Sequence, residues 1–226
     1  MSEAGKTSMR DPVEAFTALV AERGYAGVSL RDVALESGLA FAELYRRYRD
    51  KPALMAALIE RIDDEVLAGT PGQSDPEETA RDRLFDVMMR RYDALKPHRA
   101  YLRQLRQLVL RDPILALSLA PAMRRSAAAM LEAAAIPSDG LAGAVQQSGL
   151  VALHAAVFRV FQEDETTDLS KTMAALDSRL KSAENLIQTI EKYRFIALSR
   201  GRETAVSRSE EHTSELQSRL HLVCRL

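Results

Sequence analysis

The sequence has 226 residues, a formal net charge of −1 and 46% hydrophobic residues, enough to build the core of one domain or two small ones. The near-zero charge gives no global reason to expect nucleic-acid binding, so a cationic surface would have to be local. Frequent Leu, Ala, Arg and Glu with few β-branched residues favour an all-α protein. No apolar run reaches the roughly 18–20 residues of a membrane span, and no signal peptide is evident, so we expect a cytoplasmic protein.

Two helices are predicted at the start of the chain. Asp11 followed by Pro12 is typical of a helix N-terminus, with Asp as the cap and Pro in the first turn, and Gly24 ends this helix. Ser29 begins the second helix, with Asp32 three residues later in the arrangement of a capping box.

A glycine turn then leads into a short third helix. Gly38 ends the second helix, residues 40–47 form the third, and Asp50 with Pro52 begins the fourth. Two helices joined by a tight turn after a supporting helix have the layout of a helix-turn-helix, whose second helix can enter the major groove of DNA. Spacing alone is a weak signal for this motif.

The rest of the chain is predicted to be helical. The stretch "GTPGQSDP" (69–76) is typical of a loop, and "IPSDG" (136–140) of a turn. Apolar residues at helical spacing predict further helices over 77–95, 97–111, 113–135 with an interruption at Pro121, 141–162 and 168–197.

The segment "ERGYAGVSLRDVALESGLAFAELYRRYRDKPALMAALIERI" (22–62) resembles the DNA-binding domain of TetR-family transcriptional regulators. The resemblance extends over roughly residues 10–67. The positions that carry it are Gly24-Tyr25, Ser29, Val33-Ala34, Gly38, Leu44-Tyr45, Tyr48, Lys51, Ala53 and Leu54.

The resemblance implies a division of labour in DNA contact. Phosphate contacts would fall to Ser29, Tyr45 and Lys51, and base contacts to the exposed positions of the third helix, namely Ala40, Phe41, Glu43 and Arg46. A local cationic patch would come from Arg46, Arg47 and Arg49. Phosphate contacts set the register on the duplex, whereas base contacts carry sequence information.

Two residues depart from the family pattern. Ala40 stands where Ser or Thr is common, so a helix cap is missing. Glu43 stands where a small hydroxyl is common, and a carboxylate is repelled by phosphates unless it accepts from a cytosine amino group. Residues 1–67 also carry a net charge of −3. A degenerate motif with a merely solvated arginine face therefore stays open as an alternative.

For the second part of the chain the resemblance implies effector binding and dimerisation, with the effector an unknown small apolar molecule. The candidate effector-contacting residues are Met88, Tyr92, Leu105, Met123, His154 and Phe158. Methionine lines adaptable pockets but also fills irregular cores, and both readings stay open. Small residues in helix 141–162 suit close approach of another helix in a homodimer, or an ordinary core helix.

A weaker resemblance suggests an alternative function. Residues 149–184 are similar to a region of TetR-fold proteins of ubiquinone biosynthesis, which bind isoprenoid lipid and do not act as repressors. The "AELY" of the third helix, with Glu43, also fits that branch. The alternative is therefore a lipid-binding protein with a vestigial DNA-binding domain.

No motif of an enzyme, metal site or cofactor site is present. His98 and His154 lie far apart without a nearby partner at metal-ligand spacing, and neither a catalytic triad order nor a phosphate-binding loop occurs. The only cysteine, Cys224, lies in residues 208–226, which resemble the translation of a sequencing adapter and are expected to be a non-native tail.

These observations predict a two-part all-α regulator. Residues 1–67 would form the helix-turn-helix DNA-binding domain, and residues 68–200 a helical regulatory and dimerisation domain. As a homodimer the protein would bind a palindromic double-stranded operator, act as a repressor and be released by its ligand.

Overall fold

The structure, a computed structural model, describes residues 10–72 and 77–185. The described residues up to Arg179 form one compact unit, and residues 180–185 are assigned to a second. The regular elements of the described residues are all helices, which confirms the all-α prediction. The expected non-native tail over 208–226, and the predicted last helix beyond residue 185, lie outside the described residues.

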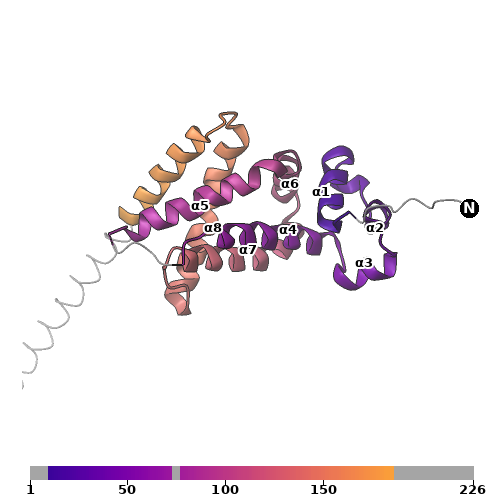
Figure 1. Cartoon of the computed structure of the whole chain (residues 1–226), viewed down its shortest axis with the longest axis horizontal. Coiled ribbons are helices and arrows are strands. Elements are labelled where there is room, and N and C mark those ends of the chain that lie inside the picture. Colours follow the sequence, from indigo (N-terminus) through magenta and orange to yellow (C-terminus); the bar gives the residue numbers. More distant parts are fainter. Residues whose placement is uncertain (1–9, 73–76, 186–226) are drawn as a thin grey trace, which may run out of the picture. The chain divides into compact units, whose positions relative to one another are not determined.

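The N-terminal helices begin and end where the sequence signals place them. They are α1 (Pro12–Arg23), α2 (Leu30–Ser37), α3 (Phe41–Arg47) and α4 (Lys51–Ala68), with a short 3₁₀ turn η1 (Tyr25–Gly27) after α1 (Figure 1). The Asp11 carboxylate accepts from two backbone amides of the first turn of α1. Ser29 and Asp32 close the capping box, and Gly38 takes the left-handed conformation that a side chain disfavours, with φ 70°.

A small apolar core holds these helices together. Phe16 of α1 is fully buried and meets Tyr25 edge-on, with the ring centroids 6.5 Å apart. Phe16 also meets Tyr101 at 6.0 Å, so α1 is packed against the second half of the chain as well as against α2 and α4. The division at residues 67 and 68 consequently stays a functional prediction, because α4 contacts both α1 and α7.

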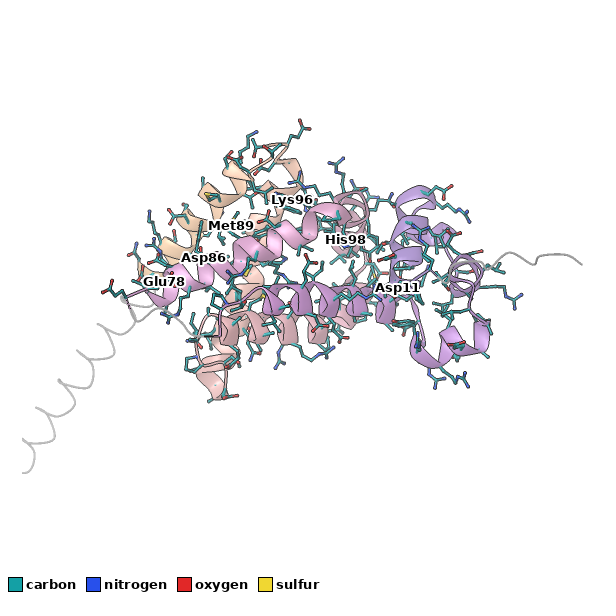
Figure 2. All side chains as sticks on the ribbon, viewed as in Figure 1. Asp11, Glu78, Asp86, Met89, Lys96 and His98 are labelled. Carbon is teal, nitrogen blue, oxygen red and sulfur yellow. The ribbon has the colours of Figure 1, made fainter. Side chains whose placement is uncertain are left out.

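The second half consists of longer helices. They are α5 (Ala80–Leu95), η2 (Lys96–His98), α6 (Arg99–Arg111), α7 (Pro113–Ala133) and α8 (Gly140–Glu163), followed by a helix that starts at residue 170 and is described to residue 185. Helix α4 runs alongside α7, and α7 also packs on α8 and α5 (Figure 1). In Figure 2 Asp86 and Met89 lie on α5, with Glu78 just before its start and Lys96 just after its end.

The interruption predicted at Pro121 is wrong, because α7 continues through it. Proline removes one helical N–H, the donor to the carbonyl of Leu117. Both residues lie on the outer face of α7, and Leu117 is 75% exposed. Solvent can therefore hydrate the freed carbonyl, and the helix continues past Pro121 to Ala133.

The acidic break after α8 is built around a buried carboxylate. Asp164 accepts hydrogen bonds from the backbone amide and hydroxyl of both Thr166 and Thr172. Burial acts to raise the pKa of Asp164, but these hydrogen bonds outweigh it and hold the pKa below its usual range. Asp164 thereby fastens the turn to the first turn of the following helix.

Within the described residues, two helices have the length and composition of a membrane span, contrary to the expectation from the sequence. They are α7 and α8, with mean hydropathies of 1.2 and 1.3 in their most apolar windows. Core helices of globular proteins share this composition. Helix α7 contributes buried residues to the interior, whereas α8 leaves much of its apolar surface uncovered.

Candidate DNA-binding surface and interior cavity

Helix α3 is held against the protein by one side chain. Leu44 is fully buried, and it is the buried residue of this seven-residue helix. Ala40 at the N-cap offers no side chain to the first amides, whereas the backbone amide of Tyr48 closes the C-terminal end on the carbonyl of Leu44 at 2.8 Å. The seating of α3 therefore depends on apolar packing more than on capping.

The outer surface of α3 carries two exposed aromatic rings. Phe41 and Tyr45 are 44% and 43% exposed, and their centroids lie 5.9 Å apart. The guanidinium of Arg31 lies over the Phe41 ring at 5.8 Å, and that of Arg49 over the Tyr45 ring at 5.1 Å. Stacking of this kind orients cations without neutralising them.

Two further arginines complete a cationic surface. Arg46 and Arg47 are exposed, and neither forms an ion pair with any residue of the described ranges. We name the set Arg31, Phe41, Tyr45, Arg46, Arg47 and Arg49 the α3 surface. Glu43 lies on the same helix, in its first turn, and is half-buried.

Several acids of the N-terminal part are paired away from α3. Two pair with cations of the same part, Asp11 with Arg61 and Glu36 with Arg10, and two pair with cations from the second half of the chain, which offset part of the net charge: Glu60 with Arg125 and Asp63 with Arg91. Asp11 lies where the start of α1 meets α4 (Figure 2). The field at the α3 surface is therefore set by its arginines rather than by the total charge.

The two predicted phosphate anchors outside α3 are already hydrogen-bonded. The Lys51 ammonium donates to the carbonyls of Tyr25 at 2.7 Å and Val28 at 3.0 Å, and burial lowers its pKa. The Ser29 hydroxyl donates to Asp32 at 2.6 Å and accepts from the Asp32 amide. A lysine ammonium carries three donors, so Lys51 retains one for a further acceptor.

This geometry agrees with a match to a known family. Residues 13–58 match the family model described as bacterial regulatory proteins, tetR family. Residues 13–58 are a TetR-family domain. The matched segment contains α1, α2, α3 and the first turns of α4, and so includes the whole α3 surface.

Solved structures extend the similarity of fold beyond the TetR-family domain. A TetR transcriptional regulator from Nitrosomonas europaea ATCC 19718 is 22% identical with a TM-score of 0.60, over 76% of this chain and 95% of that one. One from Rhodococcus sp. RHA1 is 24% identical with a TM-score of 0.54, over 75% of this chain and 93% of that one. No curated protein gives a significant match. The predicted TetR-like fold, with a helix-turn-helix followed by a helical domain, is confirmed.

In the second half of the chain, α5, α7 and α8 line a small cavity. Its volume is about 10 Å³, roughly the space of a single water molecule. The lining residues are Met88, Arg91, Met123, Ser126, Ala127, Met130, Leu150, Val151 and His154. A bound small molecule of ordinary size needs several hundred Å³, so the cavity would have to widen to hold one.

The predicted effector-contacting residues fall into two groups. Met88, Met123 and His154 line the cavity. Tyr92 lies beside it, and the Phe158 ring contacts the His154 ring in a tilted arrangement with the centroids 5.5 Å apart. Leu105 lies on α6 and takes no part in the lining.

His154 is held as a neutral ring. Its Nδ1 lies 3.0 Å from the Tyr92 hydroxyl, and the two rings stack at 5.4 Å. Burial by the surrounding helices, helped by the positive charge of Arg91, lowers the pKa of His154 from 6.5 to about 3. Burial also raises the pKa of the Tyr92 hydroxyl. Both groups therefore act at neutral pH as hydrogen-bonding groups without charge.

The sequence reasoning missed a buried polar cluster next to the cavity. Asp63 of α4 forms an ion pair with Arg91 of α5, and the Ser126 hydroxyl of α7 donates to the same carboxylate oxygen at 2.8 Å. The side chains of Arg91 and Asp63 are 4% and 11% exposed. This Asp63–Arg91–Ser126 cluster joins three helices, and two of its members line the cavity.

Proposed function

We propose that this protein is a soluble, cytoplasmic transcriptional repressor that binds a palindromic operator as a homodimer and is released by a small-molecule ligand. The observation that carries the proposal is the α3 surface. A helix-turn-helix places α3 on the outside of the protein, with two guanidiniums that form no ion pair within residues 10–72 and 77–185 and two exposed rings. A major groove is wide enough for such a helix, and guanidiniums suit both phosphates and guanine edges.

Replacing Arg46 and Arg47 together with alanine should weaken DNA binding by about a hundredfold, since each charge-assisted contact contributes roughly tenfold. The slope of log affinity against log salt should also fall by about 2 if both arginines meet phosphates. DNA sites selected by the wild-type protein from genomic fragments supply the probe, and fluorescence anisotropy across a salt series supplies the affinity.

The matched control for this experiment is Arg124→Ala, which removes an exposed arginine from α7. We expect the control to keep both the affinity and the salt slope of the wild type. Equal weakening by Arg124→Ala, or failure of the wild type to select any DNA site, would contradict the assignment of α3 as the recognition helix.

The outer face of α8 supports the homodimer. Residues at helical spacing along it are exposed and apolar or small, and Leu141 and Val145 are 90% and 73% exposed. Toward the C-terminus the same face continues with Gly149, Ala152 and Ala155. Small residues let two helices approach closely, and a face of this kind is complementary to a second copy of itself across a two-fold axis.

Val145→Glu should convert the dimer to monomer, because two like charges would meet near the two-fold axis of the proposed interface. Native mass spectrometry and sedimentation velocity of the full chain report the oligomeric state. Leu117→Glu, which introduces the same charge at a comparably exposed position of α7, should leave the dimer intact. A Val145→Glu protein that stays dimeric would place the interface elsewhere.

The lipid-binding alternative stays a prediction with one structural observation in its favour. Three methionines, Met88, Met123 and Met130, line the cavity, and their unbranched side chains can rearrange around an apolar molecule. The same native mass spectra separate the two functions. Isoprenoid or acyl lipid retained through purification, together with no selection of DNA, would favour the alternative.

A further inference from the structure

The cavity contains one permanent positive charge among largely apolar walls. Six of its nine lining residues are apolar, and its polar members are Arg91, Ser126 and His154. Arg91 comes from α5, Ser126 from α7 and His154 from α8. His154 is neutral, so Arg91 is the charged residue in the lining, and its counter-ion Asp63 is not part of the lining. An amine in the cavity would meet the guanidinium before it met Asp63, and a purely apolar molecule would leave the remaining N–H donors of Arg91 without an acceptor.

The guanidinium of Arg91 has capacity for a second anion. Among the described residues only its Nη1 atom donates a hydrogen bond, to Asp63. A guanidinium offers five N–H donors in a planar fork, which suits bidentate pairing with a carboxylate. A carboxylate that enters the cavity would bind these remaining donors. Two anions would then share one positive charge, which weakens the pair between Arg91 and Asp63, and the Ser126 hydroxyl, which donates to Asp63 at 2.8 Å, can turn to either carboxylate.

Asp63 lies on the helix that continues directly from the TetR-family domain. It follows the start of α4 by twelve residues, which corresponds to about 18 Å of helix. Two residues earlier on α4, Arg61 pairs with Asp11 at the cap of α1. If Asp63 loses its ion pair with Arg91, the position of α4 can change, and α4 is linked to α1 of the DNA-binding domain through the pair between Arg61 and Asp11.

We infer that the effector is an organic acid with an apolar body, whose carboxylate binds Arg91 and takes this cation from Asp63. The methionines rearrange around the apolar part, while the released Asp63 carboxylate moves α4 toward water. This inference rests on the proposed function for its effect on DNA, but the binding of the acid is a property of the cavity alone.

The test compares three probes of one chain length, octanoate, octan-1-ol and octylamine, on the full chain. Isothermal titration calorimetry in the absence of DNA should detect binding of octanoate at least about tenfold tighter than that of either other probe. Asp63→Asn should bind octanoate about tenfold tighter than the wild type does, because Arg91 then has no competing carboxylate. The double variant Asp63→Asn/Arg91→Met removes both charges of the pair. It should no longer bind octanoate more tightly than octan-1-ol or octylamine.

Arg124→Met, an arginine on the surface of α7, is the matched control and should bind octanoate as the wild type does. Circular dichroism confirms that each variant is folded. Octanol binding as tightly as octanoate, or octanoate affinity unchanged in the double variant, would overturn the inference.

In a separate experiment, octanoate is added to the wild-type complex with selected DNA. Acid binding that depends on Arg91 but leaves DNA binding unchanged would contradict the ligand-released repressor and leave the acid site standing.

Discussion

Arg91→Ala is expected to lower the free energy of unfolding by about 3–5 kcal/mol, one of the largest single effects in the chain. The substitution leaves the Asp63 carboxylate in the interior with the Ser126 hydroxyl as its one remaining side-chain donor in the described part of the chain. A buried carboxylate without its counter-ion has lost its hydration, and a single hydroxyl hydrogen bond does not replace that hydration. Urea unfolding followed by circular dichroism measures the change.

The control for Arg91→Ala is an exposed ion pair, that between Arg125 and Glu60, whose side chains are 63% and 60% exposed. Arg125→Ala should cost less than about 1 kcal/mol, because solvent screens such a pair. The variant Asp63→Asn/Arg91→Met should recover most of the stability that Arg91→Ala loses. Equal costs for Arg91→Ala and Arg125→Ala would show that the Asp63–Arg91–Ser126 cluster is hydrated in solution.

Leu44→Ala is expected to abolish DNA binding and to destabilise the packing of the N-terminal helices by about 2–5 kcal/mol. Leu44 is fully buried, and α3 has neither a side-chain cap nor another buried residue to hold it. A helix of seven residues is not stable by itself, so its order comes from this contact. Anisotropy with selected DNA and urea unfolding supply the two readouts.

Leu35→Ala is the matched control, because this leucine of α2 is 76% exposed. The same atoms are removed, but little apolar surface loses contact, so the stability should change by less than about 0.5 kcal/mol. Retention of DNA binding by Leu44→Ala would mean that α3 is positioned by the DNA itself rather than by the protein.

The sequence was sufficient to locate the N-terminal helices because their ends depend on local chemistry. Asp11, Ser29 and Asp50 each cap a helix through bonds to amides two or three residues away. Gly38 ends α2 through its own backbone conformation. The same local logic failed at Pro121, where the exposure of the neighbouring carbonyl decides whether a proline interrupts a helix, and exposure is a tertiary property.

The cavity could be predicted only in part. The methionines scattered over the second part of the chain indicated Met88 and Met123, and His154 lies with them because α8 packs on α7 and its His154 meets Tyr92 of α5. The Asp63–Arg91–Ser126 cluster carried no usable signal. Asp63 stands in a run of three acids that suggests a solvated surface, and its partners are on other helices, far along the chain. Charges that neutralise each other across a core are recognised only once the helices have been placed.

The hydrogen bonds of Lys51 reduce the entropy that this side chain loses when the protein binds DNA. A lysine side chain that is free in solution gives up about 1.5–2 kcal/mol of rotamer freedom when it is fixed. Lys51 has already been fixed during folding, by the carbonyls of Tyr25 and Val28 and by the Tyr25 ring 3.9 Å beneath its ammonium. A phosphate that meets the remaining N–H finds a donor that is preorganised, so that docking bears no further ordering cost at this position.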